Sequence, residues 1–137
     1  MHVTFIVNMR AGNFKGLRVW RQLEQQLTIP YTLHETKYAG HAKEITEQLA
    51  LQSHKQLVIA IGGDGTMHEV VNGANRVSHL ILGYVKGGSG NDFARGFTYF
   101  EDAKAIEAFV KEPHTCLVDS GRIIFNDTQT LYFINNF

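Results

Sequence analysis

The sequence predicts an α/β domain in which a largely parallel β-sheet lies between two layers of helices. Apolar runs typical of buried strands alternate with segments whose apolar residues recur at helical spacing. A glycine-rich turn connects the third such run directly to a helix. With 137 residues, 44% of them hydrophobic, the chain is long enough for one well-buried core and short for two domains.

The first half of the chain supplies two predicted strands and two predicted helices. Residues 3–7 are typical of a buried strand, and residues 8–13 form the loop that leaves it. A helix that ends before Pro30 follows, and residues 31–35 alternate like a second, more exposed strand. The second helix begins at Gly40. The apolar residues that mark the two helices are Leu17, Trp20, Leu23 and Leu27 in the first, and Ala42, Ile45 and Leu49 in the second.

The second half continues this alternation. Residues 56–61 and 80–85 are predicted to be the third and fourth strands, and short helices are predicted over residues 91–96 and 101–111. Strands that alternate with helices imply parallel pairs with right-handed crossovers, and ligands bind such sheets at the carboxyl ends of the strands. We therefore expect the loops after the first, third and fourth strands to meet at one edge.

The pattern changes near residue 115. Residues 116–125 and 130–134 are two β-rich runs around a polar turn, which predicts an antiparallel hairpin. We therefore divide the chain into an α/β domain of residues 1–114 and a hairpin of residues 115–137. Because the last residues are still apolar and strand-like, we expect the chain to stop at a boundary with a further domain.

The turn after the third strand has the pattern of a phosphate-binding site. Glycines allow unusual backbone dihedral angles and close approach to a ligand, and the free amides at a helix start favour an anion. The carboxylate of Asp64 would repel a phosphate unless it holds a cation or a hydroxyl, so we expect it to handle Mg²⁺ or a hydroxyl group. The alternative is a plain glycine-rich turn. The apolar face of the helix that follows consists of Met67, Val70, Val71 and Ala74.

Two motifs carry a family resemblance. Residues 62–66, Gly-Gly-Asp-Gly-Thr, resemble a signature shared by diacylglycerol kinases, sphingosine kinases, NAD kinases and, more remotely, phosphofructokinases. Residues 88–95, Gly-Ser-Gly-Asn-Asp-Phe-Ala-Arg, narrow the resemblance to the diacylglycerol kinase family. The resemblance runs over nearly the whole chain. It implies a Rossmann-like, three-layer fold related to phosphofructokinase and NAD kinase, whose final β hairpin leads to a β-rich second domain absent from this chain.

The resemblance also implies a nucleotide site built from loops at one edge of the sheet. In the first loop, Met9 stands where the family usually has proline, which restores an N–H and is expected to leave the loop less rigid. The residues that the resemblance assigns to the nucleotide are Asn8, Met9, Arg10, Ala11, Gly12, Thr36, Gly63, Asp64, Gly65, Thr66, Met67, His68, Glu69 and Ser89.

Two carboxylates are expected to serve catalysis. Asp64 and Asp92 are predicted to face the phosphates through a water or metal network, although an Asp92 that caps the short helix is the alternative. His68 suggests a metal ligand or general base, but we interpret it as a hydrogen-bonding residue at a helix start. Arg95 either pairs with a phosphate or anchors its helix, and the pattern does not decide between them.

Composition excludes several function classes. Thirteen basic and thirteen acidic residues give a formal charge of zero, so nothing favours nucleic acid or an anionic membrane surface as a partner. The single cysteine, Cys116, excludes an internal disulfide and fits a reducing cytosol. The first residues enter a predicted strand directly and no apolar run is long enough to span a bilayer, so we expect neither a signal peptide nor a membrane-spanning segment. We therefore expect a cytoplasmic protein, peripheral at the inner membrane surface when it acts on lipid.

The resemblance implies an ATP-dependent lipid kinase with ATP and Mg²⁺ as cofactors. It would transfer the γ-phosphoryl group to a diacylglycerol-like lipid acceptor, giving phosphatidate. The acceptor pocket, the general base and transient membrane contact are expected from the absent second domain, so this chain alone is expected to be inactive. Two alternatives remain, an NAD kinase-like enzyme and a non-catalytic nucleotide-binding regulatory module. The acceptor lipid and the oligomeric state, a homo-oligomer included, are left open.

Overall fold

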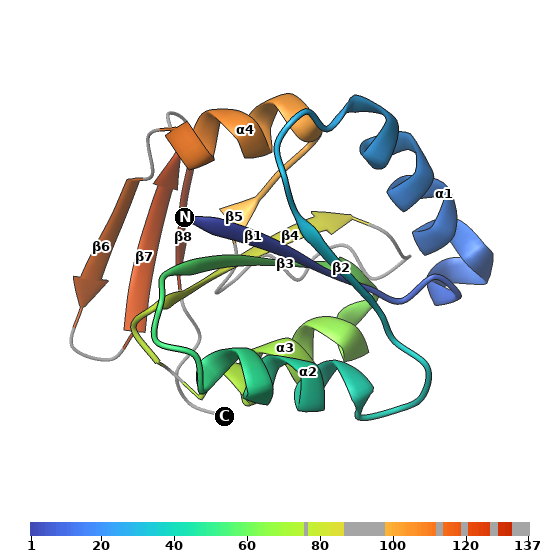
Figure 1. Cartoon of the computed structure of the whole chain (residues 1–137), viewed down its shortest axis with the longest axis horizontal. Coiled ribbons are helices and arrows are strands. Elements are labelled where there is room, and N and C mark those ends of the chain that lie inside the picture. Colours follow the sequence, from blue (N-terminus) through green and yellow to red (C-terminus); the bar gives the residue numbers. More distant parts are fainter. Residues whose placement is uncertain (76, 87–97, 112–113, 119–120, 127–128, 133–137) are drawn as a thin grey trace.

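The computed structural model describes residues 1–75, 77–86, 98–111, 114–118, 121–126 and 129–132 of the chain. Strands and helices alternate through most of this length, as the hydrophobic pattern predicts (Figure 1). The elements are β1 (His2–Val7), α1 (Ala11–Gln26), β2 (Thr32–Glu35), α2 (His41–Ala50), β3 (Gln56–Gly62), α3 (Asp64–Ala74), β4 (Leu80–Lys86), β5 (Thr98–Tyr99), α4 (Ala103–Lys111), β6 (His114–Val118), β7 (Gly121–Asn126) and β8 (Gln129–Tyr132).

A five-stranded parallel sheet forms the centre of the molecule, in the order β2-β1-β3-β4-β5. Ile61 near the end of β3 stands opposite Val7 on one side and Val85 on the other, so these strands end at the same edge. The predicted parallel α/β class is therefore confirmed. β2, which the sequence predicts to be more exposed, is an edge strand with alternating half-buried and exposed residues.

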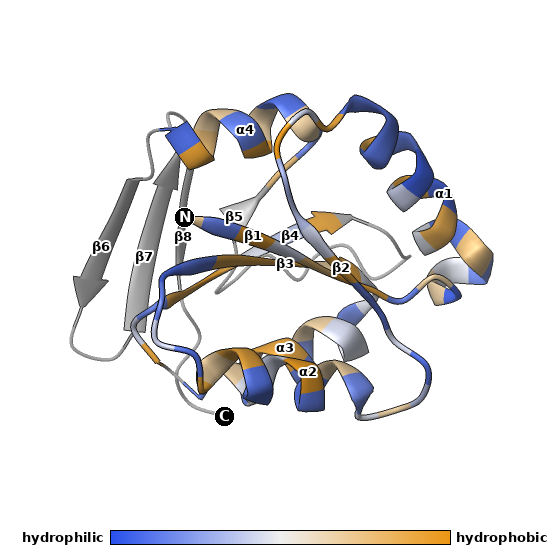
Figure 2. Ribbon diagram, viewed as in Figure 1, coloured by the Kyte–Doolittle hydropathy of each residue, from blue (hydrophilic) through white to orange (hydrophobic). Residues whose placement is uncertain are grey.

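Helices cover both faces of this sheet. Figure 1 shows α1 and α4 on one face and α2 and α3 on the other, and Figure 2 shows hydrophobic residues along the strands between them. Alternate residues of β1 divide between the two cores: Phe5 contacts the cluster that contains Trp20 of α1, and Ile6 belongs to the cluster that contains Val70 of α3. Burial on both faces explains why the strands read as continuous apolar runs.

The contact between α2 and α3 depends on a glycine. A Cβ atom added at Gly73 would lie 2.6 Å from the carbonyl oxygen of Lys43 and 2.7 Å from Cβ of Thr46. The two helices therefore approach more closely than a larger residue at position 73 would permit. All four residues of the predicted apolar face of α3 are buried, which confirms that face.

The structure departs from the sequence prediction at the start of α1 and at β5. α1 begins at Ala11, within the segment of residues 8–13 that was predicted to be a loop. The first turn of α1 contains three left-handed residues, Gly12, Asn13 and Phe14, with φ of 60°, 59° and 67°. The short strand β5 was not predicted, because two residues are too few to show a pattern. The helix predicted over residues 91–96 lies outside the described residues.

The end of the described chain is β-rich, as expected, but it is not a simple hairpin. The run predicted as one strand, residues 116–125, contains parts of two strands, β6 and β7, which pair antiparallel. β7 then pairs antiparallel with β8, and together they form a three-stranded sheet in the order β6-β7-β8. The single-strand prediction was wrong because it passed over Asp119, Ser120 and Gly121, residues typical of a turn that interrupt the apolar run between the two strands.

Candidate functional site

A cavity of about 530 Å³ opens where β1 and β2 end and α3 begins. This volume is in the range of small-molecule sites, and the position is the edge at which parallel sheets bind ligands. Two of the predicted loops and the loop after β2 contribute to it. The residues that line the cavity are Asn8, Met9, Arg10, Glu35, Thr36, Lys37, Tyr38, Ala39, Ala42, Gly65, Thr66 and Glu69.

The first turn of α3 presents backbone amides at this cavity. Gly63 precedes the helix, and the first intrahelical hydrogen bond runs from the Met67 N–H to the Gly63 carbonyl, at 3.3 Å. Helical geometry therefore leaves the N–H groups of Asp64, Gly65 and Thr66 without an intrahelical acceptor. Because these groups coincide with the positive end of the helix dipole, this part of the cavity favours an anion.

The glycines of this turn have different structural roles. A Cβ atom at Gly62 would lie 2.6 Å from Thr66 Oγ1 and 2.9 Å from Thr66 Cβ, so Gly62 is required by packing. Gly63 has φ of −91°, and Gly65 also lies outside the left-handed region. Neither of these two glycines therefore uses the left-handed conformations that glycine allows. A Cβ atom at either one would meet no protein atom within 4 Å, which leaves room for close approach by a ligand.

Four residues of the glycine turn and α3 that the resemblance assigns to the nucleotide do not line the cavity. Asp64 and His68 are exposed on α3, and Gly63 is half-buried just before it. The Met67 side chain is fully buried in the core cluster shared with α2, because it lies on the apolar face of α3. Only the backbone of Met67 faces the turn.

Glu69 contacts another helix. Its carboxylate accepts hydrogen bonds from the N–H groups of Gly40 and Ala42, at 2.9 and 3.1 Å. These amides belong to the first turn of α2, so Glu69 caps α2 from a neighbouring helix. Gly40 itself is left-handed, with φ of 91°. The sequence correctly places Glu69 away from the apolar face of α3, and the structure shows the partner that the side chain meets there.

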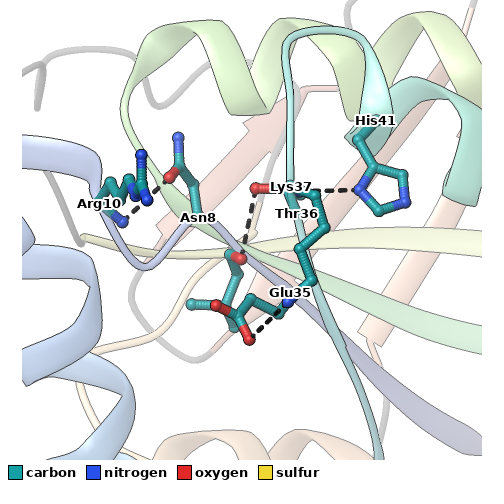
Figure 3. Close-up of polar contacts among 7 residues, drawn as sticks. Asn8, Arg10, Glu35, Thr36, Lys37 and His41 are labelled. Atoms are coloured by element: carbon teal, nitrogen blue, oxygen red, sulfur yellow. Dashed lines mark hydrogen bonds and ion pairs between the residues drawn. The ribbon is translucent and has the colours of Figure 1, made fainter.

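The first loop is closed by its own hydrogen bonds. The Asn8 side-chain oxygen accepts from the Arg10 N–H at 3.1 Å (Figure 3). The Asn8 carbonyl accepts from the Ala11 N–H at 3.2 Å. The carbonyl of Met9 accepts a further hydrogen bond of 3.0 Å from an amide of α1. Asn8, Met9 and Arg10 line the cavity, whereas Ala11 and Gly12 lie in the first turn of α1 and do not.

The loop after β2 forms the opposite wall. The Thr36 N–H donates to the Val7 carbonyl at 3.0 Å, which attaches this loop to the end of β1. Lys37 Nζ lies 3.3 Å from Glu35 Oε1, and the Lys37 N–H donates to His41 Nδ1 at 2.8 Å (Figure 3). Thr36 lines the cavity as predicted. The cavity residues that the sequence did not reveal are Glu35, Lys37, Tyr38, Ala39 and Ala42.

Two side chains beside this wall, Tyr38 and His34, have pKa values that differ from the ordinary ones. The hydrogen bond from the Tyr38 hydroxyl to Glu44 Oε1, 2.6 Å long, raises the pKa of the phenol, with burial and the Glu44 charge adding to it. Burial, and to a smaller extent the neighbouring His41, lowers the pKa of His34 below 6.5. Tyr38 therefore remains a hydroxyl at physiological pH, and His34 is disfavoured as a cation.

Within the part of the chain that the structure describes, no three His, Cys, Asp or Glu side chains come together to hold a metal ion. The predicted third loop, including Ser89, Asp92 and Arg95, lies outside the described residues.

Known lipid kinases and diacylglycerol kinases are similar to this chain. "Putative lipid kinase YtlR" of Bacillus subtilis is 39% identical over 144 residues, which cover 98% of this chain and 46% of that protein. A diacylglycerol kinase of Staphylococcus epidermidis is 39% identical over 103 residues, covering 74% of this chain and 31% of that protein. A crystal structure of a diacylglycerol kinase from Bacillus anthracis has the same fold, with a TM-score of 0.62 at 23% identity, covering 96% of this chain and 59% of that one.

The chain thus spans less than half the length of the two curated relatives. Residues 2–123 match the family model described as the diacylglycerol kinase catalytic domain. This match includes the glycine turn, the cavity at the carboxyl ends of the strands and the parallel sheet that supports them. The chain belongs to the diacylglycerol kinase catalytic domain family.

Proposed function

We propose that this chain is the nucleotide-binding part of an ATP-dependent lipid kinase. The reaction is transfer of the γ-phosphoryl group of ATP to the hydroxyl of a diacylglycerol-like lipid, giving phosphatidate. The names of the relatives support a lipid kinase. The observation that carries the nucleotide assignment is the first turn of α3, where the amides of Asp64, Gly65 and Thr66 have no intrahelical acceptor beside a cavity of about 530 Å³.

The residues around this turn suit a polyphosphate. Gly65 and Thr66 line the cavity and supply amides, and Thr66 adds a hydroxyl. Arg10 lines the cavity from the first loop and adds a positive charge that suits the phosphates. Glu35 is paired with Lys37, and Glu69 accepts hydrogen bonds from α2, so these two carboxylates are already compensated.

Mg²⁺ fits these residues only when it arrives together with the nucleotide. Proteins commonly hold this ion with one or two carboxylates and the phosphate oxygens of the substrate, rather than with a complete cage of side chains. Asp64, exposed at the start of α3, is the carboxylate that we assign to the ion or its waters. When bound, the ion supplies neutralisation of the phosphate charge during transfer.

The lipid acceptor and the general base are assigned to a segment that the longer relatives contain. No helix among the described residues is both long enough and apolar enough to cross a bilayer. We propose that the active protein works in the cytoplasm and visits the inner membrane surface to reach its lipid.

A chimera tests this proposal. The chain is joined to the portion of the Bacillus subtilis YtlR protein that it does not cover, because the two chains are 39% identical over almost all of this one. Radiolabelled γ-phosphate from ATP is offered together with diacylglycerol in detergent micelles, and NAD⁺ is offered in a parallel reaction. We expect labelled phosphatidate from the chimera and little or none from the 137-residue chain.

The other results have distinct meanings. Labelled NADP⁺ without phosphatidate would replace the proposal with an NAD kinase. Binding of ATP by the chain without transfer by the chimera to either acceptor would favour a regulatory nucleotide-binding module. A chimera carrying Gly65→Ala is the matched control, because a Cβ atom at position 65 enters the space beside the amides and meets no protein atom within 4 Å.

A further inference from the structure

Tyr38 is the one aromatic side chain among the described residues that line the cavity. It lies in the loop between β2 and α2 and is 55% exposed, one of the few large apolar side chains that the described surface presents to solvent. An exposed aromatic ring at the wall of a ligand cavity provides a surface for a second planar ring. Neither of the two sequence motifs includes it.

The ring of Tyr38 is held at two points. Its hydroxyl donates to Glu44 Oε1 at 2.6 Å, and the ring stacks on the imidazole of His41 with centroids 4.4 Å apart and planes inclined by 11°. His41 is fixed in turn, because its Nδ1 accepts the Lys37 N–H at 2.8 Å (Figure 3). This bond requires an unprotonated Nδ1. The aromatic ring is therefore oriented before any ligand arrives, which lowers the entropic cost of stacking on it.

The two walls of the cavity differ in chemistry. Figure 3 shows Asn8 and Arg10 on one side and Lys37 and His41 across from them. The amides of α3 and the Arg10 side chain suit an anion, whereas the Tyr38 ring suits a planar apolar group. A molecule with a polyphosphate at one end and an aromatic base at the other matches both walls.

We propose that Tyr38, supported by His41, is the stacking surface for the nucleobase of ATP. This inference rests on the proposed function and identifies a residue that selects a nucleotide over a free polyphosphate. Tyr38 and His41 form a pair in which one ring contacts the base and the other fixes the first ring from behind. Glu44 holds the plane of the ring and makes no contact with the base.

Binding of two ligands to the 137-residue chain tests the inference. Titration calorimetry compares ATP with inorganic tripolyphosphate, both in the presence of Mg²⁺, on the wild type, Tyr38→Ala and Tyr38→Phe. Tyr38→Ala is expected to weaken ATP binding by about 5- to 150-fold, the effect of removing one base-stacking ring, and to leave tripolyphosphate binding unchanged. Tyr38→Phe keeps the ring and is expected to bind both ligands nearly as the wild type does.

NMR of the bound nucleotide tests the stacking directly, and its wild-type part does not depend on the folding of any variant. Stacking on Tyr38 shifts the adenine H2 and H8 protons upfield, and this shift is expected to disappear in Tyr38→Leu. Leu51→Ala, at an exposed position just after the carboxyl end of α2, is the control. Its binding and its proton shifts are expected to match the wild type.

Three results would overturn the inference. Equal loss of ATP and tripolyphosphate affinity in Tyr38→Ala would mean that the ring supports the loop and does not contact the base. Unchanged ATP affinity together with an absent proton shift would place the base elsewhere. A wild-type chain that binds neither ligand would instead contradict the proposed nucleotide function itself, and the inference would fall with it.

Discussion

The helices α2 and α3 both begin beside the same cavity, but their first turns are completed in different ways. In α2, the N–H groups of Gly40 and Ala42 donate to Glu69, and the His41 N–H donates to the Tyr38 carbonyl at 3.1 Å. In α3, the first three amides precede the first intrahelical hydrogen bond and lie within the glycine motif. One helix start is closed by the protein, and the other is the one that we propose for the phosphates of the nucleotide.

This difference shows why a helix start alone does not identify an anion site. Both helices have the same backbone dipole, and residues from both line the cavity. The acceptor that α2 receives is a side chain of α3, so a phosphate at the start of α2 would have to compete with Glu69 for the N–H groups of Gly40 and Ala42. This tertiary contact closes the start of α2, so the start of α3 is the side of the cavity that favours an anion.

The largest expected effect is the loss of turnover when Asp64, at the start of α3, is replaced. Asp64→Asn in the YtlR chimera is expected to lower turnover by about 100-fold or more, the effect of losing a group that acts on developing charge. The unfolding free energy of the chain is expected to change by less than about 0.5 kcal/mol, because Asp64 is an exposed residue. Turnover that stays near the wild-type value under saturating ATP and Mg²⁺ would remove Asp64 from the reaction.

The next effect is on the closed helix start. Glu69→Ala removes the acceptor of two part-buried amides and is expected to lower the unfolding free energy by about 2–4 kcal/mol. Glu69→Gln keeps one acceptor oxygen and is expected to lose roughly half as much. Urea unfolding followed by circular dichroism measures both values. If the alanine variant were as stable as the wild type, water would be an adequate substitute for the carboxylate and the contrast between the helices would lose its energetic basis.

Two glycines of α3 sharpen the same comparison within one helix. Gly73→Ala is expected to lower the unfolding free energy by about 1–2 kcal/mol, because overlap with the backbone of α2 outweighs the gain in helix propensity. Gly65→Ala meets no protein atom within 4 Å and is expected to keep full stability. Its methyl group enters the space assigned to phosphate, so ATP affinity is expected to fall about tenfold. The reverse assignment of the two losses would contradict the roles given to these glycines.

Much of the fold could be predicted from the sequence because its causes are local. β3 and β4 are buried on both faces, so their residues form uninterrupted apolar runs, and α3 has an apolar face with helical spacing. The order of these elements along the chain then implies a parallel sheet with its ligand edge at the glycine turn. The strand pair β6 and β7 was predicted as one strand, although Asp119, Ser120 and Gly121 interrupt its apolar run with residues typical of a turn.

The site was less predictable because half of it depends on contacts between distant residues. Glu69 meets Gly40 and Ala42, which lie 29 and 27 positions earlier, and no local pattern connects them. Tyr38 lines the cavity because the loop after β2 is attached to the end of β1, where the Thr36 N–H donates to the carbonyl of Val7, 29 positions earlier. The position of the loop after β2, beside a strand end already expected to bind a ligand, was the one available signal.

The smallest expected effect is a pH dependence beside the closed helix start. Burial first, and then the nearby His41, lowers the pKa of His34 in the folded chain below its unfolded value of 6.5. As the pH falls below 6.5, the unfolded chain binds a proton at His34 more readily than the folded chain does, so the unfolding free energy decreases. The decrease continues until the pH falls below the folded pKa, and above 6.5 the contribution of His34 is fully retained.

Titration of the His34 ring protons by NMR, together with urea unfolding between about pH 7.5 and 5.5, measures this effect. His34→Gln is expected to flatten part of the decrease in stability. His41→Gln removes the smaller cause and is expected to raise the His34 midpoint only part of the way to 6.5, because burial remains. A full return to 6.5 in His41→Gln would reverse the order of the two causes, and would mean that charge near the start of α2, rather than burial, controls this side of the cavity.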